Sequence, residues 1–270
     1  MKKLHSLIFL SSLFLLLASC ESEIEIDYRS IDKIPVIEGH LTNEATRVLI
    51  TETRNMEDST KGRGISGATV TLTANNGTYE TLEYRSDGYY HSPSNLIGTP
   101  GITYTLSVLL NGQEYTSYST MQQQAAIISA TFNWERIMNT RILFYSVEIQ
   151  DIAGEENYYC YHMYRNGELY SWDVFSDKGH EDGIIAGDIF CMDETTAEEN
   201  KPEDRKEILY DGDLITLEIK AIDRRTYDYL YSLGLGERAA ANSIPNFTGN
   251  SLGYFSAHSI VRHQETFHYE

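Results

Sequence analysis

The chain has 270 residues, with 21 basic and 40 acidic side chains and a formal net charge of −19 at pH 7. Proteins that bind nucleic acid carry clustered Lys and Arg, so an acid excess of about two to one excludes that class of partner. An anionic membrane surface is disfavoured for the same reason. The chain contains 20 tyrosines, and helical periodicity is rare in it, which favours β-structure.

Residues 1–19 have the three parts of a lipoprotein export signal. Two lysines precede an apolar run from Leu7 to Leu17, and Ala18 and Ser19 lead directly to Cys20. The run contains serines and is shorter than the roughly 20 apolar residues of a membrane-spanning helix. The sequence therefore predicts cleavage before Cys20 and attachment of lipid to its thiol, which anchors the chain to a membrane. The alternative is an uncleaved anchor with a chance cysteine.

An acidic segment, residues 20–33, follows the cleavage site. Its first part, Glu21 to Asp27, looks like the acidic tether that directs lipoproteins of Bacteroidota to the cell surface. The same charges are also typical of a solvated, extended linker. Ile24 and Ile26 alternate with acids, so a strand that begins here is a further possibility.

Residues 34–121 are predicted to form an immunoglobulin-like or transthyretin-like β-sandwich. Short alternating segments separated by turn residues indicate its strands. These segments are residues 36–41, 48–53, 68–74, 78–85, 102–110 and 113–120. Asn111-Gly112 joins the last two as a tight hairpin, because both residues tolerate positive φ.

Residues 126–270 are predicted to form a second antiparallel domain, a β-rich sandwich or barrel with one short helix. The polar break at residues 122–125 separates it from the first domain, so the fold class is mainly β with two domains. Strands are expected around residues 143–149, 157–165, 169–175, 215–221 and 252–262, and an exposed loop at 193–206. Asp223 is the expected cap of the helix and Gly234 its expected end.

Cys160 and Cys191 are the thiols that remain once Cys20 carries lipid. In an oxidising compartment they can form a disulfide, which stabilises by roughly 3 to 4 kcal/mol in the chain-entropy model. The alternative is that they are two separate, small apolar residues on strands.

The sequence contains no recognisable catalytic motif, so we expect neither an enzyme nor a cofactor. The loop from Asp177 to Asp182 includes His180 and Glu181, but its spacing matches no standard calcium or zinc site. A solvated loop without metal is the expectation there. Three histidines near the end of the chain, His258, His263 and His268, are expected on an edge strand or a frayed tail.

The densest aromatic segment is the second-domain hairpin that carries Tyr159, Tyr161, Tyr170 and Trp172. Rings on neighbouring strands can form a platform on which a ligand or partner stacks. Aromatic residues also favour strands for packing alone, so the alternative is a hydrophobic core.

Several segments in a fixed order resemble the Bacteroidota lipoproteins grouped as domain of unknown function 4249. After Cys20, these are Ile34–Asn43, Ile65–Leu72, Gly101–Leu106, Tyr115–Ser117, Asp223–Leu233 and Asn246–Ala257. The resemblance covers essentially the whole mature chain and implies an outer-membrane lipoprotein, often an accessory of TonB-dependent transporters. It implies no catalytic residue.

The expected function is therefore binding, in support of a TonB-dependent uptake system at the outer membrane. Lipid on Cys20 would hold the protein on the cell surface or facing the periplasm. Two other classes remain open. A fimbrial or adhesive subunit would need an exchangeable strand. An extracytoplasmic hydrolase would need a cleft lined by convergent acids or histidines.

Overall fold

The structure is a computed structural model, and it describes residues 33–54, 62–138, 140–179, 183–193, 208–239 and 243–269. The predicted signal peptide, Cys20 and the tether up to residue 32 lie outside the described residues. Residues 33–270 form one compact unit.

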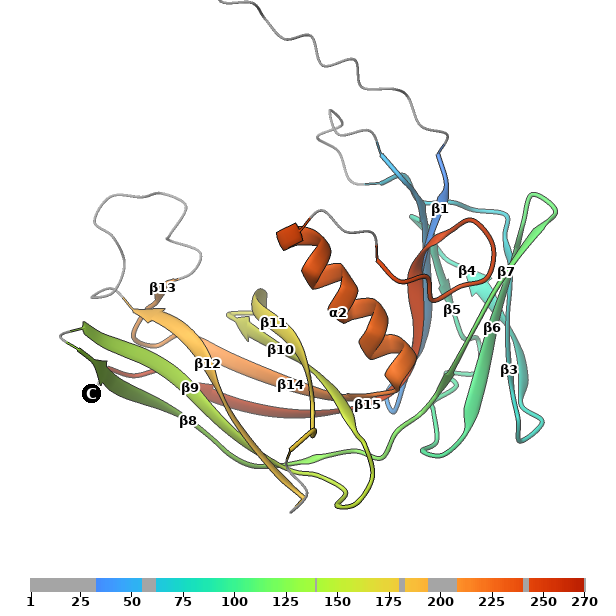
Figure 1. The fold of residues 1–270 in the computed structure, drawn as a ribbon. Coiled ribbons are helices and arrows are strands. Elements are labelled where there is room, and N and C mark those ends of the chain that lie inside the picture. Colours follow the sequence, from blue (N-terminus) through green and yellow to red (C-terminus); the bar gives the residue numbers. More distant parts are fainter. Residues whose placement is uncertain are drawn as a thin grey trace, which may run out of the picture. The chain divides into compact units, whose positions relative to one another are not determined.

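The fold is mainly β, as the sequence predicts, and the described residues contain one helix (Figure 1). The first half of the chain supplies seven strands. They are β1 (Pro35–Thr42), β2 (Thr46–Glu52), β3 (Thr69–Ala74), β4 (Tyr79–Tyr84), β5 (Tyr89–His91), β6 (Thr103–Leu110) and β7 (Gln113–Thr120). Asn111 and Gly112 both have positive φ, 52° and 80°, so the β6–β7 hairpin turns where the sequence predicts.

The second half supplies eight strands and the helix. They are β8 (Ala126–Ile137), β9 (Thr140–Gln150), β10 (Tyr158–Arg165), β11 (Glu168–Ser176), β12 (Ile184–Asp193), β13 (Ile208–Leu209), β14 (Leu214–Ile222), α2 (Arg224–Ala239) and β15 (Leu252–Thr266). The strands β5, β8, β12 and β13 are not among those predicted from the sequence.

Strand β15 links the two halves of the chain. Its first seven residues pair in parallel with β1, and residues 259–266 pair antiparallel with β14. Eleven strands thus form one sheet in the order β11-β10-β14-β15-β1-β2-β5-β4-β3-β6-β7, and a second sheet has the order β13-β12-β9-β8. The two predicted domains therefore share a sheet, and that sheet is mixed and not purely antiparallel (Figure 1).

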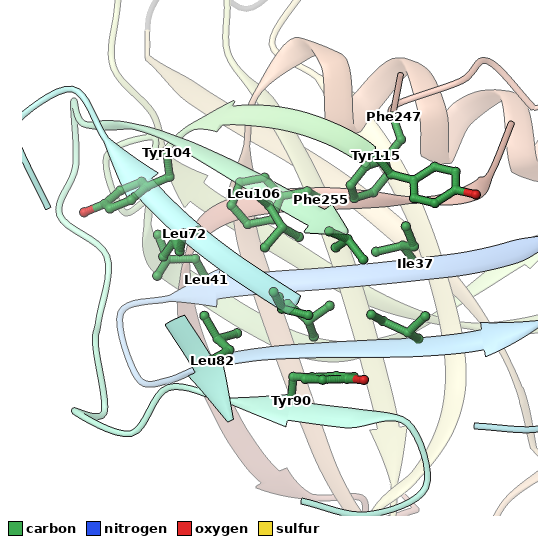
Figure 2. Packing of buried hydrophobic residues seen from close by; sticks show 14 of the residues in the cluster. Ile37, Leu41, Leu72, Leu82, Tyr90, Tyr104, Leu106, Tyr115, Phe247 and Phe255 are labelled. Atoms are coloured by element: carbon green, nitrogen blue, oxygen red, sulfur yellow. The ribbon is translucent and has the colours of Figure 1, made fainter. Parts of the chain in front are cut away.

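The first hydrophobic core lies among strands β1 to β7 and the start of β15. Alternate residues of each strand point inward, as expected for strands with one buried face. Figure 2 shows Ile37, Leu72, Leu106 and Phe255 packed together from four strands that are distant in sequence. Tyr90 is also buried here, and its hydroxyl donates to the Ile65 carbonyl 3.1 Å away, which satisfies the polar atom.

The second core lies between the four-stranded sheet and the β10-β14-β15-β11 part of the large sheet. Its centre includes four fully buried side chains, Leu143, Tyr145, Leu217 and Phe267. Helix α2 covers part of the opposite face of the same strands, where Tyr229 and Leu230 pack on Ile222. This end of the large sheet is therefore buried on both faces where the helix lies.

Helix α2 begins as predicted and ends later than predicted. The Asp223 carboxylate accepts a hydrogen bond from the Thr226 backbone N–H at 2.9 Å, which is the expected N-cap. Its other oxygen accepts from the Thr120 backbone N–H at 3.0 Å, so the cap also ties the helix to the end of β7. The helix continues through Gly234 to Ala239. A glycine inside a helix costs only about 1 kcal/mol, and the buried face of the helix offsets it.

Candidate functional site

A polar cavity of 430 Å³ lies on the face of the large sheet opposite the two cores. Five adjacent strands, β10, β14, β15, β1 and β2, contribute to it. It is lined by His40, Thr42, Glu44, Ala45, Arg47, His162, Tyr164, Glu218, Lys220, Tyr254, His258, Ile260 and Arg262. The volume falls in the range of roughly 300 to 1,000 Å³ that is typical of small-molecule sites. We refer to it as the polar pocket.

Strand register brings these side chains together. Glu218 of β14 is paired with His162 of β10 on one side and with Arg262 of β15 on the other. His40 of β1 is paired with Arg47 of β2. Because side chains alternate along a strand, residues directly opposite in register share one face, and here that face is the one that turns away from the core.

The turn between β1 and β2 closes one side of the polar pocket. The Asn43 side chain binds the backbone of Ile260 twice: its amide donates to the carbonyl at 3.1 Å and its oxygen accepts from the N–H at 2.9 Å. This contact places the next residue, Glu44, against the Arg262 guanidinium. Both Glu44 oxygens accept from Arg262, one of them from Nη2 at 2.9 Å.

Arg262 and Glu218 form the next part of an ion network. Arg262 Nε donates to Glu218 Oε1 at 2.8 Å. Burial alone would raise the pKa of Glu218, but the charges of Lys220 and Arg262 and the hydrogen bonds from them lower it overall. The hydrogen bonds that Arg262 donates to Glu44 and Glu218 raise the pKa of Arg262. Glu218 and Arg262 are therefore both ionised at neutral pH.

Lys220 is the most deeply placed cation of the polar pocket. Its side chain is 13% exposed, and its Nζ lies 3.4 Å from Glu218 Oε2 and 2.8 Å from His162 Nδ1. Burial lowers the pKa of Lys220, and the neighbouring Glu218 opposes that shift. Since an ammonium only donates, His162 Nδ1 is the acceptor, and the proton of the neutral ring is on Nε2.

The three histidines of the polar pocket are neutral at physiological pH. Burial, together with the charges of Arg47 and Lys220, lowers the pKa of His40 to about 3. Burial and Lys220 lower the pKa of His162 to about 4. Burial also places the pKa of His258 well below its usual value, and the positive groups nearby act in the same direction. The imidazoles thus serve as hydrogen-bonding groups that do not titrate near pH 7.

His40, Arg47 and Tyr254 are the three polar side chains of the polar pocket without a hydrogen bond to any described residue. The His40 ring makes edge contacts with Tyr254 and His258, with centroids 5.4 and 5.8 Å apart. Arg47 is exposed and belongs to no ion pair within the described part of the chain. Its guanidinium therefore keeps five N–H donors for water or a ligand.

A second cavity, of 260 Å³, lies between the two sheets of the second core. Its walls are mainly apolar side chains of β9, β12 and β14, including Val147, Ile185 and Ile219, and Tyr161 also lines it. Convergent charged groups are what distinguish the polar pocket from this cavity, and such groups are typical of functional sites.

The four aromatic residues singled out in the sequence do not form one surface. Tyr159 is buried, and Tyr161 and Tyr170 pack against the second core with it. Trp172 packs against the opposite cluster beneath α2. The register shifts between Met163, which pairs with Ser171, and Tyr164, which pairs with Leu169. One extra residue of β11 therefore lies between these two pairs, and Tyr170 and Trp172 face opposite ways. The alternative, a role in the core, is the correct one for Tyr159.

The expected disulfide between Cys160 and Cys191 does not form: both are free, buried thiols. Cys160 lies in the cluster beneath α2, whereas Cys191 lies between the two sheets, so strand β10 separates them. Burial raises the pKa of each thiol to about 12. They are two small apolar residues on strands, the alternative that the sequence left open.

The loop from Asp177 to Asp182 is predicted to bind no metal. The structure describes Asp177, while His180, Glu181 and Asp182 lie outside the described residues. Asp177 is buried and accepts a weak hydrogen bond from the Asn157 amide at 3.4 Å. Within the described ranges, no group of three or more His, Cys, Asp or Glu residues is arranged to hold a metal ion.

Sequence reasoning missed the polar pocket. His258 is 3% exposed and central in β15, so the prediction of an edge strand or frayed tail is wrong for it. A partial signal existed: Glu218 and Lys220 alternate with the apolar residues of β14, and His258 and Arg262 share one face of β15. Nothing local indicated that these two strands are neighbours and that β1 follows them.

Comparisons with known proteins agree with the resemblance seen in the sequence. No curated protein matches the chain. Among solved structures, a DUF4785 family protein from Legionella pneumophila is similar to 72% of this chain at 11% identity, with a TM-score of 0.24. The match spans about half, 53%, of that protein. The family model of the domain of unknown function DUF4249 matches residues 21–263. The chain therefore belongs to the DUF4249 family.

Proposed function

We propose that this protein is a lipid-anchored outer-membrane lipoprotein that acts by binding, as an accessory of a TonB-dependent uptake system. The observation that carries the proposal is the polar pocket, in which five neighbouring strands direct charged and hydrogen-bonding side chains into one cavity. A concave site with a few convergent polar groups is the usual form of a small-molecule binding site.

The chemistry of the polar pocket favours binding over turnover. A general acid or base works best with a pKa near the ambient pH. The pKa values of His40 and His162 are about 3 and about 4, and Glu218 is held ionised by two cations. These groups keep one protonation state throughout the neutral range, which suits fixed hydrogen bonds to a ligand.

The proposed anchor is lipid on Cys20, supported by the signal sequence that precedes it. The structure contains, in its described ranges, no helix with the length and apolar character to cross a bilayer. Replacement of Cys20 with Ala should abolish fatty-acid labelling and leave unprocessed or released protein. Unchanged labelling in Cys20→Ala would contradict the anchor.

The uptake role is tested by isolating the full-length protein from outer membranes in mild detergent and identifying what accompanies it. A TonB-dependent transporter that is recovered with the wild type in near-stoichiometric amounts supports the proposal. Recovery of fimbrial subunits in its place would indicate an adhesive role and overturn the uptake role.

A further inference from the structure

We propose that the ligand of the polar pocket is a small oxyanion, a molecule that presents a carboxylate or a phosphate group. This inference rests on the proposed binding function and specifies its ligand class. It follows from the balance of charges in the pocket and from the hydrogen-bond donors that remain free there.

The charges of the polar pocket do not cancel. The acidic and basic side chains in its lining, apart from the histidines, are Arg47, Lys220, Arg262, Glu44 and Glu218. Arg262 binds both acids, and Lys220 shares Glu218 with it. No acid of the lining remains for Arg47, so the lining has one positive charge in excess. This excess stands out in a chain whose formal net charge is −19.

Glu38 lies on the same face of β1 as His40, beside Tyr254. Burial raises the pKa of Glu38, and the Arg47 charge only partly opposes the shift. Glu38 is not part of the lining of the polar pocket, and no ion pair joins it to Arg47 among the described residues. The Arg47 guanidinium therefore has no direct carboxylate partner on this side either.

The free hydrogen-bonding groups of the polar pocket are mainly donors. Arg47 offers its guanidinium, and His162 offers Nε2–H because its Nδ1 already accepts from Lys220. The neutral His40 ring, which has no hydrogen-bond partner among the described residues, offers one further N–H and one acceptor nitrogen. A ligand that supplies acceptor oxygens and negative charge complements this set. Carboxylates and phosphates meet both requirements, and a guanidinium binds either through two parallel hydrogen bonds.

Arg47 is also the residue best suited to a test. Its side chain is exposed and makes no ion pair to a described residue, so Arg47→Met removes the charge and keeps much of the aliphatic stem. Lys220 is less suitable, because its removal would leave Glu218 with a weaker set of partners in a buried site. Arg85 is the matched control: it is 60% exposed and lies outside the polar pocket.

The experiment is calorimetric titration of the full-length protein in detergent with succinate, with inorganic phosphate and with succinamide, the uncharged analogue of succinate. At least one of the two anions should bind saturably, and succinamide should not. Arg47→Met should weaken that binding about tenfold or more, the loss expected for one charge-assisted contact. Arg85→Met should leave Kd unchanged within about twofold, because Arg85 lies outside the pocket lining and is already paired with Glu83.

Preference for succinate would identify a carboxylate ligand, and preference for phosphate a phosphorylated one. Failure of both anions to bind at millimolar concentration, equal binding of succinamide, or equal behaviour of the two arginine variants would overturn the inference. Unfolding midpoints of both variants should match the wild type, which shows that any loss of binding is local. Co-isolation with a transporter is measured on the same proteins. Loss of anion binding with the transporter still recovered would overturn only the ligand class. Anion binding without a recovered transporter would overturn only the uptake role.

Discussion

Gly253 of β15 faces Ile37 of β1 so closely that a Cβ atom at Gly253 would lie 2.0 Å from the Ile37 carbonyl oxygen. The φ angle of Gly253 is also positive, at 96°. No other residue type fits both the backbone angle and the space. Gly253→Ala should therefore separate the parallel β1–β15 pair and lower the free energy of unfolding by several kcal/mol, since both strain and lost packing contribute.

The matched control is Gly187→Ala in β12. An added Cβ there meets no atom within 4 Å, and the φ angle of Gly187 is not positive. The free energy of unfolding of Gly187→Ala should stay within about 0.5 kcal/mol of the wild-type value or rise slightly. Urea unfolding followed by tryptophan fluorescence measures both. Equal stability of the two variants would contradict the close approach at Gly253.

The free thiols give a second prediction. Maleimide labelling of the unfolded, unreduced protein should modify both Cys160 and Cys191, and prior reduction should not increase the number of labels. In the folded protein both should react slowly, because burial raises the pKa of each to about 12 and shields the sulfur. Labelling that depends on prior reduction would show that a disulfide exists after all.

Asp223 supplies a third prediction. One carboxylate oxygen caps α2 and the other accepts a hydrogen bond from the end of β7. Asp223→Ala should cost about 1 to 3 kcal/mol, because it removes the cap and leaves a second backbone N–H without its partner. Asp228→Ala is the control: that side chain is 43% exposed and forms only a distant ion pair with Arg224. A loss of similar size in both variants would refute a specific role of the cap.

The histidines of the polar pocket predict loss of stability at acid pH. The pKa values of His40 and His162 are about 3 and about 4 in the folded protein, and His258 is shifted in the same direction. Unfolded histidine has a pKa near 6.5, so between that value and about 4 the unfolded chain binds more protons. Stability is therefore full above pH 6.5 and is lost as the pH falls.

At pH 5 the loss has an upper limit of about 2 kcal/mol for each histidine, from a difference of about 1.5 pH units at 1.36 kcal/mol per unit. The lowered pKa of Glu218 acts in the same direction, while the raised pKa of Glu38 opposes it. Urea unfolding at pH 7.5 and pH 5 measures the slope, and His162→Gln should make it shallower. Equal stability at the two pH values would be inconsistent with buried, neutral imidazoles.

Local patterns predict much of the fold because apolar and polar residues alternate along a strand that has one buried face. Strand β7 has the bounds expected, and β6 and β10 begin within one residue of them. Strand β8 was not predicted because it is an edge strand with little buried surface, so its pattern is weak. The helix end was misplaced because Gly234 looks like a stop signal, and only tertiary packing carries α2 past it.

The polar pocket could not be predicted because it depends on which strands are neighbours. The parallel pairing of β1 with β15 joins segments about 216 positions apart in register, Val36 with Leu252, and no local signal specifies it. The faces that the aromatic side chains of the β10–β11 hairpin occupy could not be predicted for a related reason. The sequence shows that the rings are close together, but the register shift at Met163 decides which face each ring occupies.

The pairing of β15 has a consequence for folding during synthesis. The first core contains Phe255 and Ala257, so it stays incomplete until these residues, more than 130 positions after β7, have been made. Asn43 contacts the backbone of Ile260, which is 217 positions away in sequence, and contacts of such long range form slowly. During that interval β1 and β14 each expose an unpaired edge, a substrate for proteases and for aggregation. Protection from aggregation is thus needed longest by the strands that are made first, because their partner strand is made last.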